Sequence, residues 1–342
     1  MYATSDVEDA LAATREFLLP FEWATWWRLA VVAFFLSTGA GLNPPSVQTG
    51  FPPGVGDGTP FDPGAPAVPG IPVDPGAPVE TLPPEVFLLV GLLVAFGIVV
   101  GLLFAAIGAI MEFVLVESLR KERVTIRQYA TRRWRQGIRL FGFNVGVLVV
   151  TGLIVAGLTA LGLLPLLVAD SLALTAIALV VLVPAVFIVS ILSAAAIGFT
   201  SAFVVPTMVV KETGVLDGWR QFWPVLKRNA QEYLGFALVY IALVLVLGVA
   251  AGIVVGIGAV LLTIPFGVLA TIGVALLPTF GPLGYVLLFI AGTLWVLSLF
   301  VFFAFVQVPI VTFLRYYSLL LLGDTESTLD LIPDRRSEIR SV

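Results

Sequence analysis

Residues 120–139 read RKERVTIRQYATRRWRQGIR, and they hold eight of the chain's eighteen lysines and arginines. The rest of the 342-residue chain is very different, because 59% of all residues are hydrophobic and only 12% are charged. Uncharged apolar runs on both sides of this stretch exceed the roughly 20 residues that cross the hydrocarbon of a bilayer. The sequence therefore predicts an all-α integral membrane protein in which residues 120–139 join two spans.

The apolar runs predict six transmembrane spans. They are 23–42, 86–115, 140–164, a span within 171–210, a span that begins near Tyr233, and 285–314. The uncharged run 171–210 is too long for one straight crossing, and Pro184 and Pro206 predict a kink or break within it. The apolar stretch 261–284 contains three prolines, so we expect an interfacial or re-entrant connection there, packed against protein.

The positive-inside rule places the lysines and arginines of short loops on the cytoplasmic side. With six spans, all eighteen cations fall on one side, and the three loops on the other side carry none. This predicts a multi-pass protein of the cell membrane with both termini in the cytoplasm. Residues 1–22 hold five acids and one arginine, unlike a secretory signal, so we expect the first span to be retained.

The predicted organisation has three parts: an N-terminal cytoplasmic amphipathic segment (1–22), a membrane domain (23–322) and a polar C-terminal tail (323–342). Within the membrane domain, twenty of the forty-two residues 43–84 are proline or glycine, and DPGAP occurs twice. Such a composition favours extended chain without a core. We expect an extracellular spacer here, or alternatively a recognition segment for an extracellular partner.

The basic stretch is amphipathic when it is read as a helix over 117–139. Ile126, Ala130, Trp134 and Ile138 form one stripe, and a row of arginines lies beside it. A helix of this kind suits the headgroup layer, where apolar side chains enter the acyl boundary and guanidinium groups meet lipid phosphates. Binding to nucleic acid is the competing use of a basic patch, but the topology already accounts for these cations, so we expect no nucleic-acid partner.

Two further segments resemble the basic one and predict a loose threefold repeat of surface helix, span, outer loop and returning span. One is 211–232, where Trp219, Phe222, Trp223 and Leu226 fall on one helical face, and the other is 1–22. The dipeptide Lys-Glu recurs at 121–122 and 211–212. The sequence thus predicts three interfacial helices on the cytoplasmic side. The predicted ligands of anionic lipid headgroups are Arg123, Arg127, Arg132, Arg133, Arg135, Arg139, Arg220, Lys227 and Arg228.

Three stretches carry a resemblance to known proteins: FVLVESLRKERV (113–124), RRWRQGIRLFGF (132–143) and REFLLPFEWATWWRLAVVAFF (15–35). They resemble a family of uncharacterised membrane proteins from halophilic archaea. More distantly, they are similar to the membrane domain that precedes some glycerophosphodiester phosphodiesterases. The resemblance covers the chain except its C-terminal tail, and it implies a membrane fold and a high-salt source. The metal-binding His and Glu of the phosphodiesterase domain have no counterparts here.

Residues that would carry chemistry are scarce. Histidine and cysteine are absent, and the sequence contains no nucleophile, zinc or nucleotide motif, so it predicts no catalytic residue, metal or cofactor. The polar candidates inside the spans are Glu112, Asn144 and Gln307. Polar groups in a bilayer are expensive, and we expect Glu112 to pair with Arg139 or another nearby cation, the alternative being a substrate or proton site.

Small residues spaced by four predict close helix packing, at Gly97, Gly101 and Ala105 and at 248, 252 and 256. Packing within one bundle is preferred, and a homo-oligomer or a partner membrane protein is the alternative. Aromatic residues at 23, 26, 27, 316 and 317 predict an interfacial belt.

The predicted function is a non-enzymatic membrane component that organises lipid or a partner protein. The alternative is a permease for an apolar or amphiphilic solute or lipid, which would use the proline-broken spans four and six. An intramembrane lipid enzyme ranks third.

Overall fold

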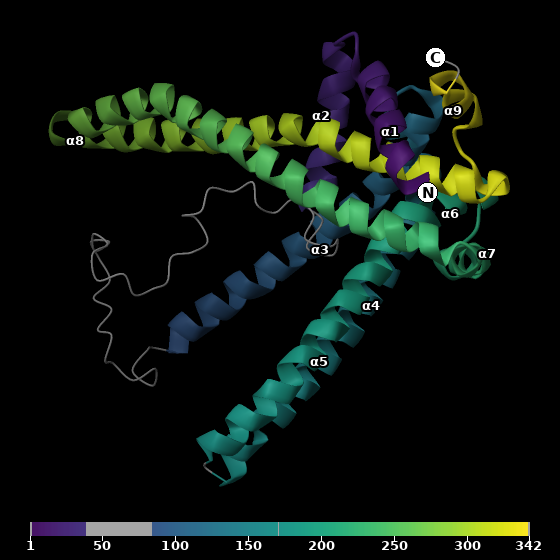
Figure 1. The fold of residues 1–342 in the computed structure, drawn as a ribbon. Coiled ribbons are helices and arrows are strands. Elements are labelled where there is room, and N and C mark those ends of the chain that lie inside the picture. Colours follow the sequence, from purple (N-terminus) through teal and green to yellow (C-terminus); the bar gives the residue numbers. More distant parts are fainter. Residues whose placement is uncertain (1, 39–83, 170, 341–342) are drawn as a thin grey trace.

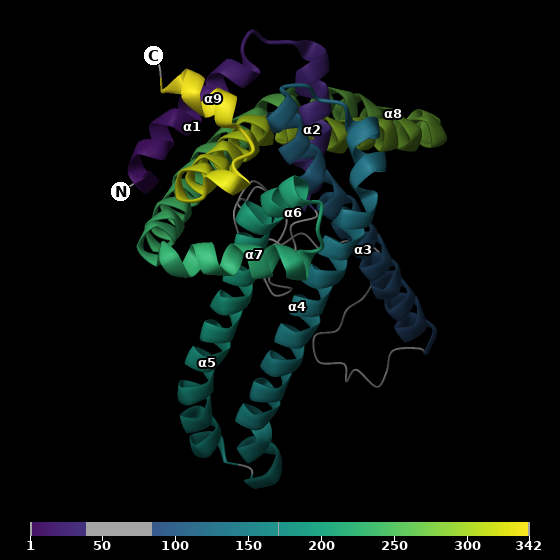
Figure 2. The same cartoon turned by 90° about the vertical axis from the view of Figure 1, so that its right-hand side faces the viewer.

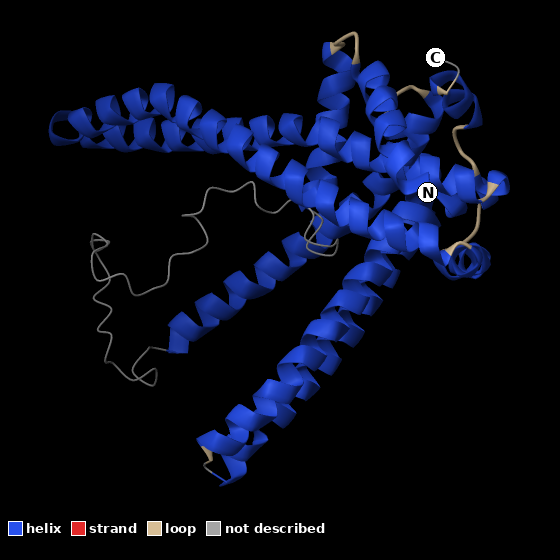
Figure 3. Cartoon of the chain, in the orientation of Figure 1, coloured by secondary structure: helices blue, strands red, loops and turns tan. Residues whose placement is uncertain are grey.

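The computed structural model describes residues 2–38, 84–169 and 171–340, and all regular structure in these ranges is helical (Figure 3). The predicted proline- and glycine-rich loop lies outside the described residues except for its last position. In chain order the elements are α1 (Tyr2–Leu18), α2 (Trp23–Thr38), α3 (Pro84–Lys121), α4 (Ile126–Ala169), α5 (Leu172–Phe199), the π-helical turn η4 (Thr200–Val204), α6 (Val205–Lys211), α7 (Val215–Arg228), α8 (Ala230–Thr325), the 3-10 turn η5 (Ser327–Leu329) and α9 (Pro333–Ile339).

Helix α8 folds back on itself at Phe280, whose φ of −134° and ψ of 53° are not helical. Pro278 and Pro282 flank this point, and each lacks the N–H that would continue the helical hydrogen bonds. The sequence predicts an interfacial or re-entrant connection at 261–284 that is packed against protein, and this prediction is wrong. This segment is helical on both sides of a tight reversal, and most of its side chains are exposed rather than packed against protein.

The two halves of α8, before and after Phe280, run antiparallel. Hydrogen bonds join them at two points that are far apart along their length. Near the middle, the indole N–H of Trp295 donates to Thr263 Oγ1 at 3.1 Å. Near the ends of the helix, the hydroxyl oxygens of Tyr233 and Thr325 lie 2.8 Å apart. Helices α4 and α5 form a second antiparallel pair, in which Thr151 hydrogen-bonds Ser193.

Four helices of the described chain are long and apolar enough to cross a membrane: Val86–Lys121, Ile126–Val168, Leu172–Lys211 and Ala230–Thr325. The sequence predicts six spans, so the number of such helices is two lower. The predicted fifth and sixth spans are the two halves of the single helix α8. The described part of the predicted first span is α2, which has only 16 residues.

The long helices meet at one end and diverge at the other (Figures 1 and 2). At the common end, α1, α2, α6, α7 and α9 pack with the adjoining ends of α3, α4 and α8, and we call this group the hub. Phe113, Phe203, Phe222 and Tyr316 are 0% exposed within its core. We call the diverging parts the arms.

The arms have few protein neighbours. The most apolar 18-residue window of α3 is 0% buried, and those of α4, of α5 to α6 and of α8 are 6%, 6% and 17% buried. Exposing so much continuous apolar surface to water is unfavourable, whereas the hydrocarbon of a bilayer accommodates it. The protein is therefore embedded in a membrane.

Helix α4 is continuous from the basic stretch into the predicted third span, so the structure does not separate an interfacial helix from the span here. Gly137 is the only glycine of the basic stretch, and it lies where α4 crosses α3. A Cβ atom at this position would stand 2.6 Å from Ile110 Cγ1, so glycine permits the close approach of the two helices. The basic residues 126–139 thus form the hub end of a long membrane helix.

Both chain ends are folded onto the hub. Helix α1 packs on α8 through Ala10 and Ala13, which are both 0% exposed. The C-terminal part is not the polar tail that the sequence predicts, because Leu329, Leu331 and Ile332 are buried in the same core.

Of the tryptophans in the predicted aromatic belt, Trp23 and Trp27 are exposed and Trp26 is half-buried, and their position at a membrane interface stays a prediction. The predicted belt is wrong for Tyr316 and Tyr317, which are 0% exposed and belong to the hub core.

The predicted glycine ridges have different surroundings. A Cβ atom added at Gly97, Gly101 or Gly256 would meet no atom within 4 Å, so the preferred packing of the α3 ridge within this chain is wrong.

In the predicted fourth span, Pro184 stays inside α5, whereas Pro206 follows the π-helical turn η4. Because Pro206 lacks an N–H, the regular hydrogen-bond pattern is interrupted at this point, as the sequence predicts.

Candidate functional site

All eighteen lysines and arginines lie on elements of the hub, and none lies on the outer part of an arm (Figure 1). Eight of the nine predicted headgroup ligands have exposed side chains there: Arg123, Arg127, Arg132, Arg135, Arg139, Arg220, Lys227 and Arg228. The ninth, Arg133, is 5% exposed. The surface of the hub is therefore the candidate site, and it has two cationic regions.

The first region follows the start of α4, and we call Arg123, Arg127, Arg135 and Arg139 the arginine row. These four side chains are exposed and make no ion pair within the described ranges. Trp134 and Ile138 are 48% and 45% exposed beside the row, and the Arg135 guanidinium lies 5.8 Å from the centre of the Trp134 ring. Unpaired guanidinium groups next to an exposed indole suit anions at a membrane interface.

The second region is the outer face of α7, where the cations already have partners. Arg220 pairs with Asp217 at 3.2 Å, and the Lys227 ammonium lies 5.2 Å from the Trp223 ring. Arg228 donates to Glu326 at 2.5 Å, and this hydrogen bond lowers the pKa of the Glu326 carboxyl. The inner face of α7 packs on the hub, with Phe222 stacked on Phe203 at 5.2 Å. Helix α7 is thus an amphipathic helix bound to protein on its apolar side.

Arg133 points inward rather than toward the surface. Its guanidinium lies 3.6 Å from Glu117, which is 1% exposed, and 3.8 Å from Glu212. Glu117 also pairs with Lys121 at 3.1 Å. The side chain of Arg133 therefore ties α4 to α3 and to the end of α6. The helical spacing of Glu117 and Lys121 signals their pairing in the sequence, but no local pattern signals that of Arg133.

Glu112 pairs with Arg315 rather than with Arg139. Both side chains are nearly buried, at 7% and 8% exposure. Ser201 of η4 donates to Glu112 at 2.8 Å, and Arg315 also donates to the backbone oxygen of Ser201 at 2.6 Å. One ion pair thus joins α3, α8 and η4, and both carboxylate oxygens of Glu112 have partners. This agrees with the expected pairing of Glu112 with a cation and gives it a structural role.

The other two polar candidates differ from Glu112. Gln307 is 0% exposed, and neither atom of its side-chain amide has a hydrogen-bond partner in the described chain. Asn144 is half-buried, and its Oδ1 atom likewise has no such partner. The structure does not bring Glu112, Asn144 and Gln307 together as one site.

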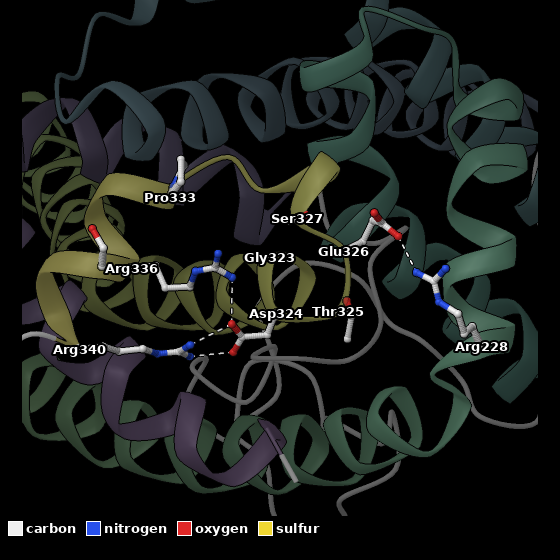
Figure 4. Close-up of a pocket in the computed structure, with 10 residues that line it drawn as sticks. Arg228, Gly323, Asp324, Thr325, Glu326, Ser327, Pro333, Arg336 and Arg340 are labelled. Atoms are coloured by element: carbon white, nitrogen blue, oxygen red, sulfur yellow. Dashed lines mark hydrogen bonds and ion pairs between the residues drawn. The ribbon is translucent and has the colours of Figure 1, made fainter.

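Sequence reasoning missed a cluster of charges where α1, α9 and the end of α8 meet. A polar hollow of about 560 Å³ opens there, and Figure 4 shows Arg336 and Arg340 directed toward Asp324 within it. Arg336 lies 2.9 Å from Asp324 and 2.7 Å from Asp330. Asp6 of α1 lies 3.1 Å from the Arg340 guanidinium and is 0% exposed. Burial and the neighbouring Asp324 raise the pKa of Asp6 to about 7.

The described residues contain no group of three or more His, Cys, Asp or Glu side chains that could hold a metal ion. The charged clusters consist of carboxylates paired with guanidinium or ammonium groups. Such clusters join helices through ion pairs and hydrogen bonds.

Comparison with known proteins gives a family and no described relative. No curated protein and no solved structure matches the chain. A family of unknown function, DUF7544, matches residues 1–332, which include all the arms and every described helix of the hub except α9. The chain belongs to this family.

Proposed function

We propose that this protein is a non-enzymatic, six-pass component of the cell membrane that organises anionic lipid around its hub. Both termini would lie in the cytoplasm. The observation that carries the proposal is that all eighteen cations lie in the hub, with the unpaired arginine row on its surface. Lysines and arginines of membrane proteins collect on the cytoplasmic side, where the lipid surface is negative. A hub that faces the cytoplasm agrees with the cytoplasmic placement of cations and brings them to the negatively charged lipid surface.

Two features support six passes. The reversal of α8 at Phe280 gives two crossings from one helix. Helix α2 begins in the hub at Trp23, and this part of the described chain stops at Thr38, within the predicted first span. Together with α3, α4 and the run from α5 to α6, these make six. The high-salt source and the likeness to the phosphodiesterase membrane domain stay predictions.

The loose repeat also has support. Helix α3 ends at Lys121 and α6 ends at Lys211, and in each case the following glutamate is left-handed. The φ angles of Glu122 and Glu212 are 51° and 53°. Left-handed backbone is uncommon outside glycine, so the same reversal at both Lys-Glu pairs favours a shared origin of the two segments.

The proposed topology predicts which positions a membrane-impermeant maleimide can reach. Natural cysteine is absent, so single-cysteine variants have no background. In intact cells, Arg132→Cys and Lys227→Cys are expected to stay unlabelled until the membrane is opened, whereas Gly70→Cys in the predicted extracellular loop is labelled. Labelling of position 132 or 227 in intact cells would refute the proposed orientation.

The proposed lipid site predicts a preference for anionic headgroups. Each cation near an anionic surface contributes about 1 kcal/mol. Changing Arg123, Arg127, Arg135 and Arg139 together to glutamine is therefore expected to reduce bound phosphatidylglycerol at least about tenfold relative to phosphatidylcholine. Native mass spectrometry of the full chain released from equimolar mixed nanodiscs measures this ratio.

The matched control changes the same four positions to lysine, which keeps the charge and is expected to retain most of the preference. Equal ratios in the wild-type and glutamine proteins would show that the arginine row does not select lipid. Added salt should weaken the wild-type preference, because exposed charges are screened.

One observation favours the permease as a second candidate. Gln307 is buried in α8 with both amide atoms unpartnered, which is costly unless they serve another group. Transport by proteoliposomes that falls when Gln307 is changed to leucine would support this function. No movement of apolar or amphiphilic solutes by the wild-type protein would remove it.

A further inference from the structure

One guanidinium group joins the two ends of the chain to the end of α8. Arg340, which follows α9, lies 3.1 Å from Asp6 and 2.8 Å from Asp9 of α1. The same side chain lies 2.7 Å from Asp324 of α8, as Figure 4 shows. This single cluster of charges thus helps to hold α1 and α9 against the end of α8.

Asp6 is the unusual member of this cluster. Its side chain is 0% exposed, and its Oδ2 atom has no hydrogen-bond partner among the described residues. The Oδ1 atom of Asp6 lies 3.1 Å from the Arg340 guanidinium, and Asp324 lies 2.7 Å from the same guanidinium, so two carboxyl groups share one cation. A second buried carboxylate beside Asp324 is unfavourable, both because burial disfavours charge and because the two charges repel.

We infer that Asp6, Asp324 and Arg340 form a proton-dependent latch, which holds α1 and α9 firmly when Asp6 is protonated and less firmly when it is ionised. This inference is independent of the proposed lipid function.

Several other groups face the latch. Asp9 comes from α1, Tyr317 from α8, Asp330 from the turn after η5, and Arg336 from α9. With every acid ionised, the four aspartates outnumber Arg336 and Arg340 by two charges. A proton on Asp6 halves that excess. The arginines stay charged at all physiological pH values, so they cannot relieve it.

The direction of the pH effect follows from the pKa of Asp6, which is raised from 3.8 to about 7. The attached state therefore holds the proton more tightly than the released state does. The stability of attachment is greatest at low pH, falls as the pH rises from about 4 to about 7, and is level above that. Release of α1 would uncover the contact between Phe17 and Tyr316, whose rings are 6.1 Å apart.

Hydrogen exchange of the full-length protein in detergent micelles tests the latch. The readout is the protection factor of amides 2–18, corrected for the chemical exchange rate, at pH 5.5 and pH 8.0. Protection is expected to be about thirtyfold lower at pH 8.0, because pH 5.5 lies about 1.5 units below the shifted pKa and each unit corresponds to about a tenfold change. Asp6→Asn, which stays neutral, is expected to abolish this difference and to exceed wild-type protection at pH 8.0.

The matched control is Asp9→Asn, which loses one bond to Arg340 but leaves Asp6 in place. It is expected to lower protection at both pH values and to keep the difference between them. Equal wild-type protection at pH 5.5 and 8.0 would overturn the inference, and this comparison needs no variant to fold. A pH difference that persists in Asp6→Asn would also overturn it, because another group would then be responsible.

Discussion

Replacing Arg315 by methionine is expected to lower the free energy of unfolding by about 3–5 kcal/mol. The methionine side chain would fill a similar space but leave Glu112 as a nearly buried carboxylate without its cation. Only the Ser201 hydroxyl would still donate to it. The loss would weaken the packing of three elements of the hub, because this ion pair joins α3, α8 and η4. Unfolding of the purified protein in mixed detergent micelles with increasing sodium dodecyl sulfate measures the change.

The double variant Glu112→Met/Arg315→Met separates the ion pair from the space it occupies. Removing both charges leaves no unpaired charge, so the double variant is expected to be more stable than Arg315→Met alone. Arg139→Met serves as the control, because Arg139 is exposed and its loss is expected to change stability by less than about 0.5 kcal/mol. If the double variant were less stable than Arg315→Met, charge burial would not be the source of the effect.

The sequence is sufficient to predict those parts of the fold that depend on local composition. Apolar length identifies the membrane helices, and charge asymmetry identifies the end where the cations gather. The break near Pro206 follows from its missing N–H. The exposure of Trp23, Trp134 and eight of the nine cations also follows from helical periodicity and charge.

The hub could not be predicted in the same way, because its contacts join residues far apart in the chain. Glu112 and Arg315 are 203 positions apart, and Arg340 and Asp6 are 334 apart. Composition alone also does not predict the packing of the C-terminal segment. Residues 323–342 are polar on average, yet Leu329, Leu331 and Ile332 are buried in the core. Arg133 has the same local sequence surroundings as its exposed neighbours, and it points inward because Glu117 and Glu212, which are distant in the sequence, lie beside it.

The continuity of α4 is a third case. The change from basic to apolar sequence near residue 140 suggests a boundary between a surface helix and a span. Nothing in the backbone chemistry requires one, because no proline lies between Ile126 and Phe143. A glycine normally weakens a helix by about 1 kcal/mol relative to alanine, and two lie in this range: Gly142, which is in open space, and Gly137, which lies against Ile110 of α3. The place of Gly137 in an uninterrupted helix indicates a packing reason.

Two alanine substitutions on α4 are expected to have opposite effects on stability. At Gly137, the new Cβ would lie 2.6 Å from Cγ1 and 2.9 Å from Cα of Ile110. The backbone of α3 cannot yield as a flexible side chain can, so overpacking is expected to cost about 1–3 kcal/mol and to exceed the gain in helix propensity. At Gly142, five residues further along, a Cβ would meet no atom within 4 Å. Gly142→Ala is therefore expected to gain up to about 1 kcal/mol.

The two variants share a helix and a substitution, so the difference between their unfolding free energies isolates the contact with Ile110. Changing Ile110 to alanine removes Cγ1 and should recover part of the loss in Gly137→Ala. Recovery should be incomplete, because the backbone Cα of Ile110 remains within 2.9 Å of the new atom. If Gly137→Ala were as stable as Gly142→Ala, α3 and α4 would not cross as closely as described. The arginine row, whose position depends on that crossing, would then face a different direction.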